Sequence, residues 1–226
     1  MTDISKYKEL EKNEDKFGIF YDRLVKTNEK FNLTAVTEKN EVAVKHFIDS
    51  LMGIEFIDVD KSVVDVGSGA GFPSLPMAID RKDVKFTLVE SNNKKCGFLN
   101  EIKEELQLEN VDVLCARAED IALKTEYREN FDYAVARAVA QTNTLLEYLL
   151  PFVKVGGKAL LWKGESYGSE LENSKNALNI LGGEVKSVKK YSLGEYGERY
   201  IVVIEKIKST PAKYPRGLGK ERKCPL

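Results

Sequence analysis

The spacing of apolar and polar positions divides the chain into regions with different periodicity. In residues 1–60, apolar side chains recur at intervals of three and four, which is typical of amphipathic helices. One helix is indicated by Phe17, Phe20, Tyr21, Leu24, Val25 and Asn28. A second, over about residues 40–55, places His46, Asp49 and Ser50 on a different face from Val44, Phe47, Ile48, Leu51 and Met52. No strand-like run occurs here, so we predict a helical N-terminal extension over residues 1–60.

From residue 61 the pattern changes to short β-branched runs separated by helical stretches. The runs are SVVDV, KFTLVE, VDVLC, FDYAVA, KALLW and RYIVVIE. Helical patterning lies between them at residues 92–107, 141–150 and 167–181. This alternation predicts a mostly parallel sheet with helices on both faces. We therefore assign residues 61–207 to one α/β domain, on which the N-terminal extension packs as an additional layer.

The last part of the chain, residues 208–226, has a different composition. It contains three prolines and two glycines, and six basic side chains against one acidic side chain. Such a segment buries little apolar surface by itself. We predict a basic C-terminal tail that is mobile or becomes ordered on a partner.

Composition excludes several classes of protein. The 226 residues are 42% hydrophobic, enough for a full core, and 35 basic against 36 acidic side chains give no global positive field. Cys96, Cys115 and Cys224 have neither Cys-x-x-Cys spacing nor metal-ligand histidines, which predicts reduced thiols and no disulfide or zinc. The start, MTDISKYKEL, is charged, and no apolar stretch reaches membrane-spanning length. We expect a cytoplasmic monomer without membrane or metal partners.

A glycine-rich turn follows the first β-branched run, where Asp65 leads into Gly67-Ser-Gly69-Ala-Gly71. Glycines let the backbone approach a ligand closely. In a dinucleotide fingerprint a glycine would follow at position 72, which is Phe72 here, so an NAD-dependent oxidoreductase is a weak interpretation. Asp65 would repel a pyrophosphate but attract a sulfonium and an ammonium group. We predict that S-adenosylmethionine (SAM) binds at this turn, with an ordinary strand-to-helix loop as the alternative.

Acidic residues at the ends of the next two runs favour a nucleoside site. Glu90 ends the second run, 23 residues after Gly67, where an acidic residue would accept both ribose hydroxyls. The third run leads into Arg117-Ala118-Glu119-Asp120, in which a backbone amide and a carboxylate would hold the adenine edge. An exposed charged loop explains Asp120 equally well. Glu90 is the residue that raises the glycine turn above a chance match.

Several longer segments occur together in this chain: FNLTAVTE (31–38), KHFIDSL (45–51), VVDVGSGAGFPSLPMAI (63–79), FDYAVARAVA (131–140), WKG (162–164), ERYIVVI (198–204) and YPRGLGKERKCPL (214–226). With them the chain resembles, nearly end to end, the small-subunit ribosomal RNA methyltransferase G family, also known as glucose-inhibited division protein B. The combination of Asn32-Leu-Thr34 with His46-x-x-Asp49-Ser50 ahead of the glycine turn is the distinctive part.

The resemblance implies a class I SAM-dependent methyltransferase (Rossmann-like) fold, with a mostly parallel seven-stranded sheet and a helical N-terminal extension. It implies methyl transfer from SAM to N7 of a guanine in 16S rRNA, either as naked RNA or within the small ribosomal subunit. It also implies SAM contacts at Gly67, Phe72, Glu90, Ser91, Asn92, Ala118, Glu119 and Arg137, in addition to Asp65 and Gly69 of the turn.

Guanine N7 carries a lone pair and no proton, so its methylation needs no general base. At the end of the fourth run this chain has Ala136-Arg137-Ala138, and neither an Asn/Asp-Pro-Pro-aromatic motif nor a cysteine nucleophile. We expect Arg137 and His46 only to position the reactants. Arg137 would donate to guanine, to a phosphate or to the SAM carboxylate, and the resemblance favours SAM. A structural hydrogen bond between the helical layer and the sheet explains His46 equally well.

Substrate contacts are expected from polar and basic side chains near the cofactor. The candidates are Asn32, Thr34, His46, Asp49, Ser50, Lys94, Lys95 and Lys163. Asn32 and Thr34 also fit turn and helix-cap roles. Because the net charge is near zero, RNA would be bound by clustered basic residues, including Arg117 and the tail from Lys208 to Lys223. Two alternatives remain, a small-molecule SAM methyltransferase and a non-catalytic SAM- or RNA-binding protein.

Overall fold

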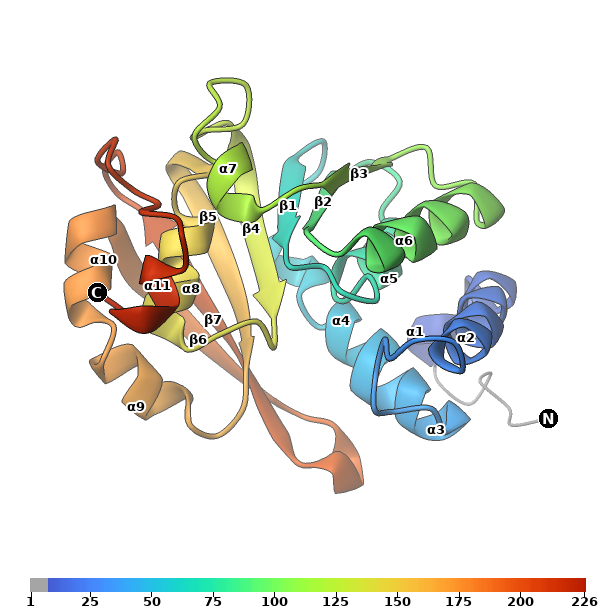
Figure 1. Cartoon of the computed structure of the whole chain (residues 1–226). Helices are drawn as coiled ribbons and strands as arrows, with labels where there is room; N and C mark the ends of the chain where they lie inside the picture. Colours follow the sequence, from blue (N-terminus) through green and yellow to red (C-terminus); the bar gives the residue numbers. More distant parts are fainter. Residues whose placement is uncertain (1–7) are drawn as a thin grey trace.

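A seven-stranded sheet forms the centre of the computed structural model, which describes residues 8–226 (Figure 1). The strand order is β3-β2-β1-β4-β5-β7-β6. The first five strands are parallel, whereas β7 runs antiparallel to both β5 and β6. The predicted mostly parallel sheet is thus confirmed. The strands are β1 (Ser62–Val66), β2 (Lys85–Glu90), β3 (Val111–Cys115), β4 (Phe131–Arg137), β5 (Val153–Lys163), β6 (Gly183–Ser192) and β7 (Glu198–Lys206).

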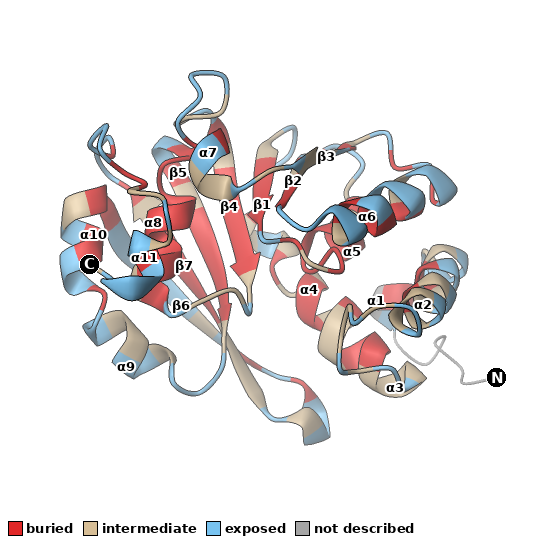
Figure 2. Ribbon diagram, in the orientation of Figure 1, coloured by how far each residue is buried: buried red, intermediate tan, exposed pale blue. Residues whose placement is uncertain are grey.

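Alternate strand residues face two separate apolar clusters. In β1, Val63 packs into one cluster and Val64 into the other, as the two-residue period of a strand requires. Figure 2 shows these central strands as buried. One face is covered by α5 (Ser74–Asp80) and α6 (Asn93–Glu105), and the other by α8 (Thr142–Leu149) and α10 (Lys175–Leu181). The short helices α7 (Ala118–Ile121) and α9 (Tyr167–Glu172) follow β3 and β5.

The N-terminal extension packs on the face of the sheet that carries α5 and α6 (Figure 1). Its contact with the domain is aromatic: the Phe20 ring stacks on Phe72, with the centroids 5.3 Å apart. The helical prediction is confirmed for the described residues, and residues 1–7 of the predicted extension lie outside them. The elements are α1 (Lys8–Glu11), α2 (Glu14–Asn28), α3 (Lys39–Val42), a π-helical turn (Ala43–Ile48), α4 (Asp49–Leu51) and a 3₁₀ turn (Ile54–Phe56).

The π-helical turn changes the predicted polar face of the second helix. Wider turns of this kind are rare and shift every later residue around the helix axis. As a result Asp49 and Ser50 are buried, although His46 remains half-exposed. Trp162 of β5 donates from Nε1 to the Asp49 carbonyl at 2.8 Å, which ties the helix to the sheet.

Two elements differ from the predicted pattern. Strand β6 was not indicated by a β-branched run because it is an edge strand whose EVKSVKK segment is mostly polar and exposed. The helix predicted over 167–181 is interrupted between α9 and α10. There Ser174 donates from Oγ to the Glu170 carbonyl at 2.6 Å, and such local bonds compete with helix continuation.

The C-terminal segment is predicted from sequence to be mobile or to become ordered on a partner. That prediction is wrong, because the segment packs against α8 of the same chain and contains α11 (Lys220–Lys223). Glu147 of α8 is fully buried and forms an ion pair with Arg216, whose Nη2 lies 2.7 Å from Oε2. Thr144 donates from Oγ1 to the Glu221 carbonyl at 2.9 Å. A buried carboxylate needs a partner, and composition alone does not show that the tail supplies it.

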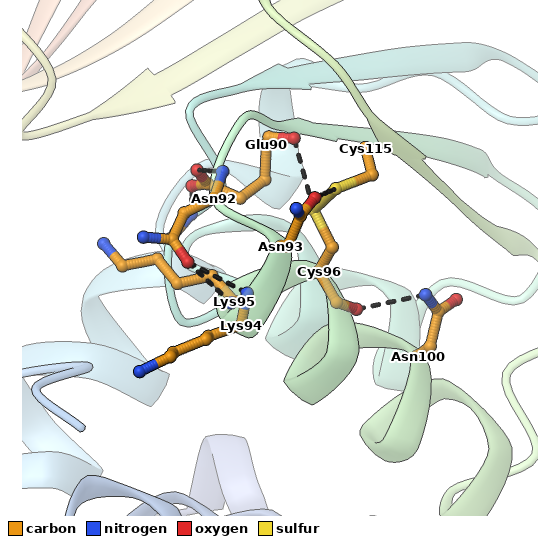
Figure 3. Close-up of a disulfide and its surroundings, with 9 residues drawn as sticks. Glu90, Asn92, Asn93, Lys94, Lys95, Cys96, Asn100 and Cys115 are labelled. Atoms are coloured by element: carbon orange, nitrogen blue, oxygen red, sulfur yellow. Dashed lines mark hydrogen bonds between the residues drawn. A yellow bond between two sulfur atoms is a disulfide. The ribbon is translucent and has the colours of Figure 1, made fainter. Parts of the chain in front are cut away.

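The prediction of three reduced thiols is also wrong, because Cys96 and Cys115 form a disulfide (Figure 3). Cys115 is the last residue of β3 and pairs with Glu90, the last residue of β2. Cys96 lies in α6, the helix that follows β2 in the chain. The two Cα atoms are 5.8 Å apart although 19 residues separate the cysteines in sequence. Strand pairing brings them together, so their spacing gave no signal. Cys224 is free and exposed.

Among residues 8–226, no helix has the length and apolar character to cross a membrane. Within the same residues, no group of histidine, cysteine and acidic side chains is arranged to hold a metal ion.

Candidate functional site

The glycine turn after β1 has a backbone that only glycine adopts readily. Gly67 and Gly71 have φ angles of +73° and +91°, in the left-handed region. A Cβ at Gly67 would lie 3.1 Å from Val139 Cγ2, and one at Gly71 would collide with Leu75. The turn therefore requires glycine for close packing as well as for conformation.

A cavity of about 190 Å³ opens beyond the ends of β1, β2 and β3. Parallel sheets bind ligands at this carboxyl edge, close to the point where strand order reverses. We call it the cofactor pocket. It is lined by Val66, Gly67, Val89, Glu90, Ser91, Ala116, Arg117, Ala118, Glu119, Val139, Tyr148 and Arg222. The predicted cofactor residues Gly67, Glu90, Ser91, Ala118 and Glu119 are thus brought together.

Glu90 is held in one orientation by two backbone amides. Gly69 N donates to Oε2 at 3.0 Å, and Asn92 N donates to Oε1 at 2.8 Å. Because each carboxylate oxygen accepts more than one hydrogen bond, both oxygens keep capacity for ligand hydroxyls. Asn92 also caps α6 by accepting from Lys94 N at 2.9 Å (Figure 3). Gly69 and Asn92 therefore orient Glu90 and do not themselves line the pocket.

Asp65 is a buried carboxylate without an ion-pair partner, and it lies outside the residues that line the cofactor pocket. Its side chain is 1% exposed, and neither carboxylate oxygen accepts a hydrogen bond from the described residues. Burial raises the pKa of Asp65 to about 7, although the nearby hydroxyl and backbone N–H of Ser74 and the positive charge of Arg137 act in the opposite direction. An unpaired buried carboxylate is costly, and a cationic group would relieve that cost. The carboxylate therefore fits the α-ammonium group of SAM.

A second cavity, of about 320 Å³, adjoins the cofactor pocket at the end of β4. Ala138 lines the second cavity and the next residue, Val139, lines the first. We call the second cavity the basic pocket because four of its side chains are basic and one is acidic. It is lined by Lys45, His46, Asp49, Arg137, Ala138, Trp162, Lys163, Gly164 and Arg199.

Arg137 is the centre of a hydrogen-bond network in the basic pocket. Its Nη1 donates to Asp49 Oδ2 at 2.7 Å and to the Lys45 carbonyl at 3.0 Å. Its Nη2 lies 3.1 Å from His46 Nδ1. The same Nδ1 lies 3.1 Å from the Lys45 carbonyl, and Nε2 forms a hydrogen bond with Thr34 Oγ1 at 2.8 Å. Burial together with the positive charge of Arg137 lowers the pKa of His46 to about 4, so the ring is neutral at neutral pH.

Phe72 lies outside the cofactor pocket, although a SAM contact is predicted for it. Its ring stacks on His46 with the centroids 4.5 Å apart, and the Arg137 guanidinium carbon lies 5.0 Å from the ring centroid. Phe72 thus packs against His46 and Arg137 of this network. The predicted SAM contacts of Phe72 and Arg137 stay predictions.

The remaining substrate candidates are spread over different environments. Lys163 lines the basic pocket, but its Nζ is paired with Glu170 Oε2 at 2.7 Å. Ser50 is fully buried and donates to the His46 carbonyl, so it faces neither pocket. The others lie outside the residues that line the two pockets: Asn32 and Lys94 are exposed, Lys95 is half-exposed, and Thr34 stands behind His46.

Several residues that line the two pockets were not among the predicted site residues. Arg222 reaches the cofactor pocket only because the C-terminal segment packs on α8, and Tyr148 carried no signal in its helical pattern. Trp162 and Arg199 of the basic pocket lie in segments that carry the family resemblance, which was the available signal.

Solved structures share the fold. A crystal structure of M. jannaschii TYW2 in complex with AdoMet matches 71% of this chain and 76% of its own, with a TM-score of 0.53 and 22% identity. An rRNA methylase from Streptococcus thermophilus matches 71% of this chain and 95% of its own, with a TM-score of 0.51 and 18% identity. These likenesses confirm the predicted class I methyltransferase fold.

Comparison of sequences is more specific. "Ribosomal RNA small subunit methyltransferase G" of Leuconostoc mesenteroides is 46% identical over 93% of this chain and 90% of its own length. The protein of the same name from Clostridium perfringens is 46% identical over 96% and 93%. A sequence model described as rRNA small subunit methyltransferase G matches residues 13–201. The resemblance is confirmed together with SAM as the cofactor, and the chain belongs to the rRNA small subunit methyltransferase G family.

Proposed function

We propose that this protein transfers the methyl group of SAM to N7 of a guanine in 16S rRNA. The observation that carries the proposal is the junction of two unlike pockets at the end of β4: one is lined by Glu90 and follows directly on the buried Asp65, and the other is rich in basic donors. Carboxylates suit the hydroxyl and ammonium groups of a cationic nucleoside, and basic donors suit phosphate and guanine acceptors.

The residues of the cofactor pocket would bind SAM by complementary charge and hydrogen bonds. Glu90 would accept the ribose hydroxyls, and Ala118 with Glu119 would hold the adenine edge. Asp65, which directly precedes the lining residues Val66 and Gly67, would receive the α-ammonium group. Bound SAM supplies a methyl group that its sulfonium already activates. Fixed placement of the two reactants contributes on the order of 7–11 kcal/mol in such reactions.

The residues of the basic pocket would position guanine without removing a proton from it. Both ring nitrogens of His46 are engaged, and the Asp49 carboxylate is bound by Arg137. Among the described residues that line this pocket, no other histidine or carboxylate is present. The absence of a free base there fits N7, whose lone pair attacks directly, better than an exocyclic amine that must lose a proton.

The test uses SAM with a labelled methyl group and small ribosomal subunits from cells that lack their own enzyme of this family. We expect one labelled guanosine that is sensitive to borohydride and aniline, the cleavage chemistry of N7-methylguanosine. RNA with 7-deazaguanine at that site is the matched control because it lacks only N7. Label in a small molecule alone, or in a nucleotide resistant to cleavage, would contradict the proposal. Naked 16S rRNA assayed in parallel shows which form is the substrate.

A further inference from the structure

Tyr191 of β6 ends in the same network as Arg137, although it lines neither pocket. Its hydroxyl donates to Asp49 Oδ1 at 2.6 Å, while Arg137 donates to the other oxygen, Oδ2, at 2.7 Å. Tyr191 is 8% exposed and Asp49 is 4% exposed, so water does not replace this donor. The Asp49 carboxylate is therefore fixed from opposite sides by groups on β6 and β4.

The backbone of Asp49 is fixed as well, because Trp162 donates to its carbonyl at 2.8 Å. With the main chain held, the remaining freedom of Asp49 is rotation of its carboxylate. The hydrogen bond from Tyr191 prevents that rotation and keeps Oδ2 toward Arg137. The guanidinium in turn lines the basic pocket, and its positive charge acts on Asp65.

We infer that Tyr191 is a positioning residue for methyl transfer: through Asp49 it fixes the Arg137 guanidinium at the junction of the two pockets. This inference rests on the proposed function for its kinetic consequences. Its geometric consequence does not depend on substrate, because Arg137 also contacts His46, the single histidine of the chain.

The chain offers a matched control for loss of a buried tyrosine hydroxyl. Tyr133 of β4 is 3% exposed and donates to Asp58 Oδ2 at 2.8 Å, and neither residue lines the cofactor or basic pocket. Tyr133→Phe therefore removes the same kind of bond at a distance from Arg137. A general loss of stability would appear in both variants, whereas loss of positioning would appear only in Tyr191→Phe.

The first measurement is kinetic. In Tyr191→Phe we expect kcat on the small subunit to fall about tenfold while the Kd for SAM stays within about twofold, since a hydrogen bond to a charged group is commonly worth tenfold or more. Tyr133→Phe should keep the wild-type kcat. Combining Tyr191→Phe with Asp49→Asn should cost less than the sum of the two single effects, because both act on one contact.

The second measurement is titration of His46 by NMR, which needs no substrate. The positive charge of Arg137 contributes to the low pKa of His46. If Arg137 moves away in Tyr191→Phe, the pKa of His46 rises toward its ordinary value, while Tyr133→Phe leaves it unchanged. A Tyr191→Phe protein with wild-type kcat and wild-type His46 titration would overturn the inference. Wild-type protein without methylation of the subunit would instead contradict the proposed function, and the titration would still test Tyr191.

Discussion

The buried carboxylate of Asp65, which has no ion-pair partner, predicts that SAM affinity depends on pH. The pKa of Asp65 is raised to about 7, so the neutral acid dominates below that pH, whereas the α-ammonium group needs the ionised form. Between pH 7 and pH 5.5 the ionised fraction falls from about one half to about 3%, so the apparent Kd should rise about 15-fold. This corresponds to roughly 1.6 kcal/mol. Binding should also release a proton, which calorimetry in buffers of different ionisation enthalpy measures.

Other titrations do not obscure this range. His46, whose pKa is about 4, stays neutral over most of it, and an α-amino group titrates only at about 7.7–8.0. 5′-Methylthioadenosine is the control ligand because it keeps the nucleoside but lacks the cationic sulfonium and the amino acid group, and its Kd should not change with pH. Asp65→Asn should bind SAM weakly at every pH. The reasoning would be refuted by equal SAM affinity at pH 5.5 and 7, or by the same slope for 5′-methylthioadenosine.

Ionisation of Asp65 favours SAM binding but lowers the stability of the SAM-free protein. Because the folded pKa of Asp65 lies above its usual value of 3.8, its contribution to stability is present below pH 3.8 and is lost as pH rises through about 7. Asp65→Asn should therefore raise the Tm of SAM-free protein at pH 8, and the gain should shrink at pH 5. The ionisation cost is at most on the order of 4 kcal/mol. If Asp65→Asn is no more stable than wild type at pH 8, then ionised Asp65 does not destabilise the folded protein.

Three further predictions concern Glu90, the C-terminal segment and the disulfide. Glu90→Gln directs an amide group toward a backbone N–H and should weaken SAM binding about 10- to 100-fold in calorimetry; an unchanged Kd would exclude Glu90 as the ribose ligand. Glu147→Ala removes the ion-pair partner of Arg216, whose guanidinium keeps its hydrogen bond to the Cys224 carbonyl, and should lower the free energy of unfolding in urea by about 1.5–3 kcal/mol. It should also weaken SAM binding, and unaltered unfolding would mean that the segment is not anchored there. Reducing the Cys96–Cys115 bridge should destabilise the protein by roughly 3 kcal/mol, as its loop length implies. Tm with and without a phosphine reductant measures this effect, Cys96→Ser should not respond to the reductant, and an identical wild-type Tm would contradict the bridge.

The fold could be predicted from sequence where burial selects apolar residues. β1 and β2 read as strands because residues such as Val64 and Leu88 are buried within a covered sheet. The edge strand β6 could not be recognised from its pattern, because most of its side chains are exposed and nothing selects apolar residues there. Local rules thus predict the elements that carry the core, and they fail at the edges.

Site residues could be predicted from sequence where they lie at the end of a predicted strand. Glu90 and Gly67 follow directly from strand ends that meet at one edge of a parallel sheet. Ser50 shows the limit, because an ideal helical period put it beside Asp49 on a polar face, whereas it bonds inside the helix. Arg222 and Tyr191 reach the site through tertiary packing, which the sequence pattern does not encode.

The π-helical turn at Ala43–Ile48 makes the site depend on the length of the chain as well as on its residue types. One residue of helix corresponds to a rotation of about 100°. Deleting a single residue within this turn would leave the helix intact, yet it would swing Asp49 away from Arg137. A complete set of point substitutions would not reveal this dependence, because each variant keeps the register. A scan of one-residue deletions along the helix would reveal it. The largest loss of activity is expected for the deletions that disturb helix formation least.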